Sequence, residues 1–317
     1  MNNYISLIGD TPIYECNKFN EYMQLKSKVY CKLEFLNPSG SIKDRAVKEI
    51  ILDYLEKGKV NKNTVIIEAT SGNTGIALSG IARALELKSI IVMPENMSEE
   101  RKEIIKALKS ELVLTDAELG MLGANEKAIK LSNEISNSII LDQFNNRNNV
   151  KAHFKTAKEI FDDISDVSYI VASVGSGGTI MGISEYVKKN KLNCEIVAVE
   201  IADNPILSKG KFGKHNIQGI GANFIPSILN KKMIDKIILV SEEEVYKIAN
   251  EFVMQEGLLI GMSSALNLVG ATKLAKEEEN KKIVVIFPDD GYKYLSTPMY
   301  KKRTWYKSYF NLSIVWM

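Results

Sequence analysis

The stretch that decides the fold lies in the middle of the chain and reads Tyr169-Ile170-Val171-Ala172-Ser173-Val174-Gly175-Ser176-Gly177-Gly178-Thr179. An apolar run ends at Val174, a glycine-rich turn follows, and apolar residues then recur with helical spacing from Ile180 to Tyr186. Near-continuous apolar runs are typical of parallel strands buried on both faces. The stretch therefore predicts a buried strand, a tight turn and the start of a helix.

The same alternation continues outward in both directions. Stretches with helical spacing, clearest at residues 76–85 and 152–164, lie between further short apolar runs. These runs begin at Val29, Val65, Ile90, Leu112, Ile139, Ile196 and Val284. Strands that alternate with helices along a whole chain predict an α/β protein with parallel sheets.

Composition excludes several classes of protein. The 317 residues are 45% hydrophobic and 25% charged, which excludes a disordered or fibrous chain. Lys and Arg total 41 against 39 for Asp and Glu, so the formal net charge is only +2. Proteins that bind nucleic acid or membrane surfaces usually carry a clustered positive excess. We expect neither kind of partner.

The cysteines and the N-terminus indicate a cytoplasmic protein. Cys16, Cys31 and Cys194 lie far apart without a C-x-x-C pair, which disfavours both a disulfide framework and a zinc site. With only two histidines, the chain has little material for any metal site, and we expect none. The first residues lack the pattern of a signal peptide, and no apolar run approaches the length of a membrane span.

The glycine loop, residues 175–179, is suited to a phosphate group. Glycines let a backbone approach a ligand closely, and a helix start offers free N–H groups and the positive end of the helix dipole. The loop is not a nucleotide P-loop, and it fails the G-x-G-x-x-G pattern because Ile180 stands where the third glycine would fall. An NAD-dependent dehydrogenase is therefore disfavoured. A turn needed only for strand–helix packing is the alternative.

A second loop, Thr70-Ser71-Gly72-Asn73-Thr74-Gly75, also lies between an apolar run and a helical pattern. This hydroxyl loop combines three hydroxyls, an amide and the free N–H groups of a helix start, which together can hold a carboxylate without a basic side chain. An N-cap needs only one such residue. The surplus favours a ligand site.

A third segment, Asn37-Pro38-Ser39-Gly40-Ser41-Ile42-Lys43-Asp44-Arg45, follows the run that begins at Val29. A lysine in a turn is most often a solvated surface group. Lys43, however, stands where an apolar strand meets a helix that we expect to begin near Arg45. A partly desolvated lysine has a lowered pKa and can act as a Schiff-base amine or a general base.

Together the three segments resemble those of the fold-type II pyridoxal-phosphate enzymes, most closely the cysteine synthase (O-acetylserine sulfhydrylase) and cystathionine β-synthase branch. The resemblance extends from about Ile8 to Thr297, nearly the whole chain. Intermediate stretches that agree include Met93-Pro94-Glu95-Asn96-Met97-Ser98, Asp142-Gln143-Phe144, Ile217-Gln218-Gly219-Ile220-Gly221-Ala222 and Gly261-Met262-Ser263-Ser264.

The resemblance implies a role for each matching residue. Lys43 would bind pyridoxal 5'-phosphate covalently and move the Cα proton of the substrate. Asn73 would bond to the 3-hydroxyl of the cofactor, and Ser263 to its pyridine nitrogen, with Ser264 as the alternative. The phosphate would be held by Gly175, Ser176, Gly177, Gly178 and Thr179. The substrate α-carboxylate would be held by Thr70, Ser71, Thr74 and Gln143.

The activity implied is β-replacement on a serine-derived amino acid through an aminoacrylate. The default reaction is that of cysteine synthase, in which O-acetylserine and sulfide give cysteine and acetate. The segments Ser41-Ile42-Lys43-Asp44-Arg45 and Gly-Ser-Gly-Gly-Thr differ from the Ser-Phe-Lys and tetraglycine motifs of dehydratases and racemases. A non-catalytic ligand-binding member of the family is a rival, disfavoured by the intact lysine, asparagine and serine.

Two departures from the family pattern bear on the substrates. Asn223 stands where relatives usually have glycine, on the substrate side of the site, and could orient water, a thiol or an acceptor amino acid. A tolerated loop change is the alternative. Asn223 makes a second activity plausible, in which cysteine is the donor, hydrogen sulfide is released and lanthionine or serine forms. The stretch Thr156-Ala157-Lys158-Glu159 lacks the usual Thr-Gly-Pro.

The expected architecture is two open, twisted α/β domains with the cofactor in the cleft between them. A smaller, mobile domain would span residues 44–148, and a larger one would join residues 1–43 to 149–317. The family also implies a homodimer. The aromatic tail, residues 303–317, would pack on its own domain or serve as a subunit contact or lid.

Overall fold

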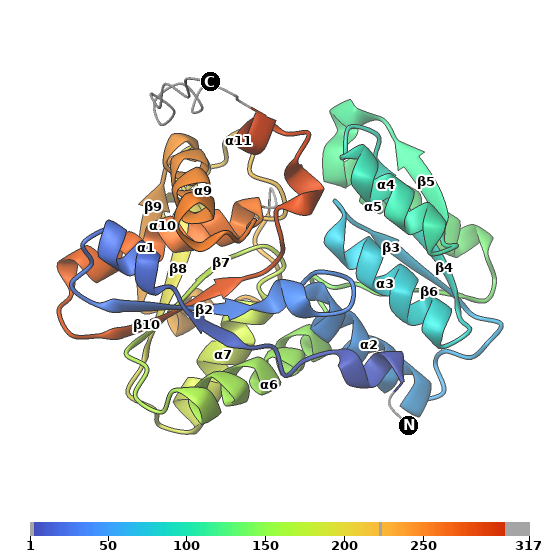
Figure 1. The fold of residues 1–317 in the computed structure, drawn as a ribbon. Coiled ribbons are helices and arrows are strands. Elements are labelled where there is room, and N and C mark those ends of the chain that lie inside the picture. The colour runs from blue at the N-terminus through green and yellow to red at the C-terminus, as the bar shows by residue number, and fades with distance from the viewer. Residues whose placement is uncertain (1–2, 222–223, 302–317) are drawn as a thin grey trace, which may run out of the picture.

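The computed structural model describes residues 3–221 and 224–301 and contains two twisted sheets flanked by helices (Figure 1). The larger sheet has six strands in the order β1-β2-β10-β7-β8-β9, and the smaller has four in the order β5-β4-β3-β6. Apart from the antiparallel pair β1–β2, neighbouring strands are parallel. The predicted α/β class with parallel sheets is thereby confirmed.

The larger sheet draws its strands from both ends of the chain. Its members are β1 (Ile13–Glu15), β2 (Lys28–Leu33), β7 (Tyr169–Ser173), β8 (Glu195–Ile201), β9 (Lys236–Val240) and β10 (Lys282–Phe287). The long helices around it are α6 (Arg147–Asp163), α7 (Gly178–Lys189), α9 (Glu242–Glu256) and α10 (Met262–Glu277). Short helices are α1 (Asn17–Tyr22), α8 (Ile206–Lys209) and α11 (Pro298–Lys301).

The smaller sheet is formed by one continuous part of the chain. Its strands are β3 (Val65–Ala69), β4 (Lys88–Pro94), β5 (Glu111–Thr115) and β6 (Ser138–Ile140). Its helices are α3 (Asn73–Ala84), α4 (Glu99–Ala107) and α5 (Gly120–Glu134), and α2 (Lys43–Glu56) packs against both α3 and α6. The division into domains at residues 44 and 148 stays a prediction.

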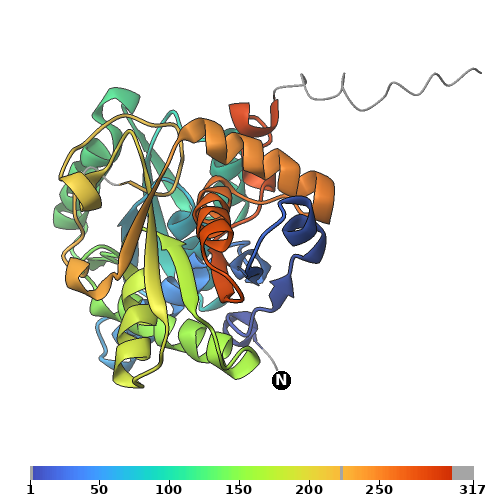
Figure 2. The same cartoon turned by 90° about the vertical axis from the view of Figure 1, so that its left-hand side faces the viewer.

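Both faces of each sheet are covered, which explains why the strands are apolar throughout. In the larger sheet, α10 packs across β7 to β10 on one face while α6 and α7 cover the other (Figures 1 and 2). In the smaller sheet, α5 covers one face and α3 the other. Parallel strands sandwiched in this way have no solvent-facing side, so polar alternation is lost.

The structure refines several predicted boundaries. The run from Val29 ends as a strand at Leu33, because Phe35 lies in a 3₁₀ turn (Glu34–Leu36). Strands β1 and β9 lay outside the predicted runs. The helix expected to begin near Arg45 begins at Lys43, so this lysine belongs to the first helical turn. Within the described residues, no helix is both long and apolar enough to cross a membrane.

Candidate active site

Lys43 is the first residue of α2, and its amine lies beside the glycine loop. Its Nζ donates to the hydroxyl of Ser176 at 3.4 Å. Lys43 and the glycine loop, which are far apart in the sequence, are therefore in contact. Burial lowers the pKa of the Lys43 amine to about 8, although the carboxylates of Glu68 and Asp289 act in the opposite direction. A substantial fraction of the amine is therefore neutral, and nucleophilic, near neutral pH.

A buried ionic cluster fixes the start of α2. The Arg45 guanidinium binds both oxygens of Glu34, with Nε–Oε2 at 2.6 Å, and also contacts Glu159 on α6 at 2.6 Å. Lys32 of β2 pairs with the same Glu159 at 2.8 Å. Glu159 is part of the stretch that departs from the family pattern, and here it ties α6 to α2. The position of Lys43 is therefore set by a strand, a helix and their shared ion pairs.

The glycine loop leads from β7 into α7, and steric limits explain its glycines. Gly177 has φ of +86°, a conformation that other residues rarely adopt. A Cβ on Gly178 would lie 1.9 Å from the side-chain oxygen of Asn149, and one on Gly175 would lie 2.7 Å from the carbonyl oxygen of Gly219. Neighbouring segments therefore press on the loop from two sides, and only glycine leaves its backbone in place.

The polar side chains of the glycine loop are held from α6. Asn149 donates to the Ser176 hydroxyl at 2.9 Å and to the carbonyl of Gln143 at 2.8 Å. The Thr179 hydroxyl lies 3.3 Å from His153 Nε2, and His153 Nδ1 lies 3.1 Å from the hydroxyl of Thr156. Burial lowers the pKa of His153 well below its usual range, and the charges of Arg45 and Lys43 reinforce this effect. A neutral imidazole therefore bonds to the loop.

The hydroxyl loop leads from β3 into α3, and a buried chain of hydrogen bonds supports it. Thr74 donates to Gln143 Oε1 at 2.8 Å, and Gln143 Nε2 donates to Glu68 at 2.8 Å. Thr70 accepts from the backbone N–H of Gly72 at 3.1 Å. Burial raises the pKa of Glu68 to about 8. Thr70, Thr74 and Gln143 thus lie together as expected, while Ser71 is half-buried beside them.

Asn73, at the start of α3, is linked to the end of β10. Its Nδ2 donates to Asp289 Oδ2 at 2.7 Å, and the hydroxyl of Tyr294 donates to the same oxygen. The side-chain oxygen of Asn73 is buried and has no partner among the described residues. An acceptor held in this way is ready for a ligand hydroxyl.

Ser263 and Ser264 begin α10 and have different surroundings. The Ser264 hydroxyl donates to the carbonyl of Asp289 at 2.9 Å and is completely buried. The Ser263 hydroxyl has no hydrogen bond to another described residue. Ser263 is therefore the serine available to a ligand, and its contact with a cofactor ring stays a prediction.

Four supporting residues escaped the sequence reasoning: Glu68, Asn149, His153 and Asp289. Each of them forms a hydrogen bond with a predicted site residue. None of them belongs to one of the three loop motifs. Glu68 had a visible signal, because it is the one acid in the apolar strand Val65-Ile66-Ile67-Glu68-Ala69. For Asn149, His153 and Asp289, only the packing of α6 and β10 against the loops reveals the contact.

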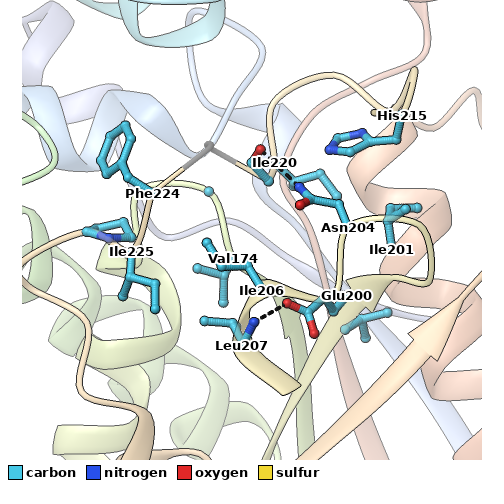
Figure 3. Close-up of a pocket in the computed structure, with 14 residues that line it drawn as sticks. Val174, Glu200, Ile201, Asn204, Ile206, Leu207, His215, Ile220, Phe224 and Ile225 are labelled. Atoms are coloured by element: carbon cyan, nitrogen blue, oxygen red, sulfur yellow. Dashed lines mark hydrogen bonds between the residues drawn. The ribbon is translucent and has the colours of Figure 1, made fainter. Parts of the chain in front are cut away.

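A separate pocket lies behind the glycine loop, and Figure 3 shows it between the segment after β8 and the segment that carries Phe224 and Ile225. Neither Lys43 nor Ser263 lines it, so it is not the reaction centre. Its wall includes Val174, Gly175, Glu200, Asn204, His215 and Phe224. Glu200 accepts from the backbone N–H of Leu207 and thereby fixes α8. Asn223 and residues 303–317 lie outside the described part of the chain.

The residues present fit pyridoxal phosphate. A partly buried lysine of lowered pKa can bond to an aldehyde, the N-terminus of α7 presents free backbone N–H groups, and Asn73 offers an unused acceptor. Ser263 adds a free hydroxyl at the start of α10. These groups come from four segments that are distant in the sequence, and they complement the aldehyde, phosphate and ring substituents of that cofactor.

Comparisons with known proteins agree with this fit. Residues 5–289 match the family described as pyridoxal-phosphate dependent enzymes. Cysteine synthase B of Campylobacter jejuni is 47% identical over 296 residues, which are 93% of this chain and 97% of that protein.

Two solved structures are similar over most of their length. Cysteine synthase of Entamoeba histolytica superimposes with a TM-score of 0.91 at 38% identity, covering 95% of this chain and 91% of that one. A hydrogen sulfide-producing enzyme of Fusobacterium nucleatum has a TM-score of 0.89 at 37% identity, covering 93% and 100%. The chain described here belongs to the family of pyridoxal-phosphate dependent enzymes.

Proposed function

We propose that this protein catalyses β-replacement on a serine-derived amino acid in the manner of a cysteine synthase, converting O-acetylserine and sulfide to cysteine and acetate. The observation that carries the proposal is the position of Lys43, a partly buried amine of lowered pKa beside the glycine loop. The 47% identity to a cysteine synthase supports the choice of reaction.

The cofactor would be held by residues of both sheets. Lys43 binds its aldehyde carbon, the backbone N–H groups of the glycine loop bind its phosphate, Asn73 accepts from its ring hydroxyl and Ser263 meets its ring nitrogen. When bound, pyridoxal phosphate supplies an electron sink for charge that develops at the substrate Cα. Ser263 offers a neutral hydroxyl rather than a carboxylate, so the protein does not hold a fixed negative charge against the ring.

The amino-acid substrate would be positioned by the hydroxyl loop. Thr70, Ser71, Thr74 and Gln143 offer hydroxyl and amide donors at the start of α3, where the helix dipole also favours a carboxylate. The bonds from Thr74 to Gln143 and from Gln143 to Glu68 fix the orientation of these donors. With the carboxylate held here, Lys43 would take the Cα proton, and the β-substituent would leave.

A second candidate activity uses cysteine as the donor. The hydrogen sulfide-producing structural neighbour favours it. In this reaction, one cysteine loses its thiol as hydrogen sulfide, and a second cysteine or water adds at Cβ to give lanthionine or serine. The Asn223 side chain would orient that acceptor, a proposal that rests on the sequence alone.

Two properties of the assembly are also proposed. The protein would act as a homodimer in the cytoplasm, and the smaller domain would close over the reacting groups and exclude water. The family resemblance implies the dimer, and the three free cysteines suit a reducing compartment.

The test is the visible spectrum of the purified protein with two substrate mixtures, O-acetylserine plus sulfide and L-cysteine alone. We expect a yellow protein that makes cysteine from the first mixture, and the Lys43→Ala variant should lose both colour and turnover. Lys57→Ala, on the exposed end of α2, is the matched control and should retain both. Sulfide release from L-cysteine at a higher rate than cysteine synthesis would favour the second activity. A folded protein that stays colourless with added cofactor would refute both.

A further inference from the structure

Arg101, near the start of α4, is a buried cation without a role in the reaction proposed above. Only 2% of the residue is exposed. One of its terminal nitrogens, Nη1, donates to the side-chain oxygen of Gln218 and, at 3.4 Å, to the Ser98 hydroxyl. Its guanidinium carbon lies 4.8 Å from the centre of the Tyr294 ring. Its Nε is buried and has no hydrogen-bond partner among the described residues.

No carboxylate of the described chain neutralises this guanidinium. On α4, Glu99 pairs with Lys102 and Glu103 with Lys106. Glu100, directly before Arg101, forms no ion pair among the described residues, and its Oε2 is buried without a hydrogen-bond partner. Beside Tyr294, Asp290 pairs with Lys293, and Asp289 accepts from Tyr294 and Asn73. Within residues 3–221 and 224–301, Arg101 therefore forms no ion pair.

Such a charge is costly to bury without a counter-ion. An aromatic face and one amide oxygen stabilise a buried cation only in part. Together they do not replace the hydration that the ion loses on burial. The Nε donor also loses its water without gaining a partner. This combination indicates a site that is completed by an anion.

The location of Arg101 shows which anion can reach it. A Cβ built on Gly72, in the hydroxyl loop, would lie 2.2 Å from Arg101 Cδ and 2.4 Å from its Nε. The Arg101 side chain therefore lies against the backbone of the loop that we assign to the substrate. Gln218, on its other side, belongs to the segment that continues into Gly219 and Gly221.

We propose that Arg101, together with the amide of Gln218, binds a carboxylate of the reactants. This inference rests on the proposed function, which supplies two such groups. One is the α-carboxylate of an amino acid, and the other is the acetate that departs from O-acetylserine. Both are small planar anions that a guanidinium can bind with two parallel hydrogen bonds.

The test compares the wild-type holoenzyme with Arg101→Gln and Arg101→Lys. The first arm titrates L-serine and follows the absorbance of the bound cofactor. The second arm measures the melting temperature in sodium acetate against sodium chloride of equal ionic strength. Arg147→Gln is the matched control, because Arg147 is exposed and pairs only with Glu185 on the surface. Neither arm depends on turnover, because both measure binding. A failure of the proposed reaction would appear in the turnover assay and can therefore be distinguished from a failure of this inference.

We expect Arg101→Gln to raise the apparent dissociation constant by about tenfold or more in one arm, as for the loss of a charged hydrogen bond. A loss in the L-serine arm identifies the α-carboxylate, and a loss of acetate-dependent stabilisation identifies the departing acetate. Arg101→Lys, which keeps the charge, should recover part of the affinity. Unchanged binding of both anions in a folded Arg101→Gln protein would overturn the proposal and leave Arg101 a structural contact.

Discussion

The glycine loop after β7 and the hydroxyl loop after β3 have the same strand–turn–helix plan but use different parts of the chain to meet a ligand. In the glycine loop, the side chains of Ser176 and Thr179 are engaged by α6, and backbone N–H groups remain to bind. In the hydroxyl loop, side chains supply most donors, and Gln143 and Asp289 orient them from other segments. The first loop should therefore be sensitive to added atoms and the second to removed ones.

The largest effect should follow from adding one methyl group to the glycine loop. Gly178→Ala places a Cβ 1.9 Å from the Asn149 side-chain oxygen, so the loop or α6 must move. Overpacking of this kind costs about 1–3 kcal/mol, which corresponds to about five- to 150-fold weaker cofactor binding if the whole cost falls on the bound state. Titration of the apoprotein with pyridoxal phosphate measures it. Gly257→Ala has open space around the site and pays only for its positive φ, so it should bind normally.

A double variant tests whether the contact with Asn149 causes the effect of Gly178→Ala. If the clash with Asn149 is the cause, then Asn149→Ala in the Gly178→Ala background should recover cofactor affinity by about tenfold, as for other directly coupled pairs. The single Asn149→Ala variant completes the cycle and reports the loss of the bond to Ser176. Additive effects in the double variant would mean that the methyl group acts on the loop in another way.

Removal of a hydroxyl tests the other loop. Thr74→Val keeps the shape of the side chain but deletes the donor to Gln143, which should raise the KM for the amino acid by about five- to tenfold. The cofactor spectrum should stay the same, because Thr74 is not expected to touch the cofactor. Thr64→Val, another buried threonine with a hydrogen-bonded hydroxyl, is the control and should affect only stability. Loss of the cofactor absorption band in Thr74→Val would contradict the assignment of Thr74 to the substrate rather than to the cofactor.

The smallest effect is a shift of the pH profile of Lys43, the lysine beside the glycine loop. Below its pKa of about 8 the Lys43 amine is mostly protonated and cannot attack an aldehyde. The rate of cofactor capture by the apoprotein should therefore rise about tenfold per pH unit and level off above pH 8. Asp289 raises the pKa of Lys43, so Asp289→Asn should move this plateau to lower pH. Stopped-flow measurements over a range of pH give the profile of each protein. A plateau that moves to higher pH in Asp289→Asn would contradict the inference that Asp289 raises the pKa of Lys43.

Patterns within one segment explain what could be predicted. The apolar runs of β3, β4, β7, β8 and β10 are each buried on both faces, so their composition alone indicated parallel sheets. Each loop motif carries its own signal, and the structure brings Lys43 to Ser176 and Thr74 to Gln143, while the roles of these residues stay predictions. Strand β1 has only three residues, too few to show a periodicity, whereas β9 was missed although its sequence Ile237-Ile238-Leu239-Val240 is an apolar run like those of the predicted strands.

By itself, the sequence determined the fold class, the three loops and the chemistry that their residue types permit, because these follow from local spacing and composition. Only the tertiary structure decided which distant residues support them. Glu68 lies behind Gln143, Asp289 joins Asn73 from the end of β10, and Arg101 enters between the hydroxyl loop and Gln218 without a counter-ion. Such contacts depend on how two sheets pack together, and the energy of a buried charge depends on what surrounds it rather than on its neighbours in the chain.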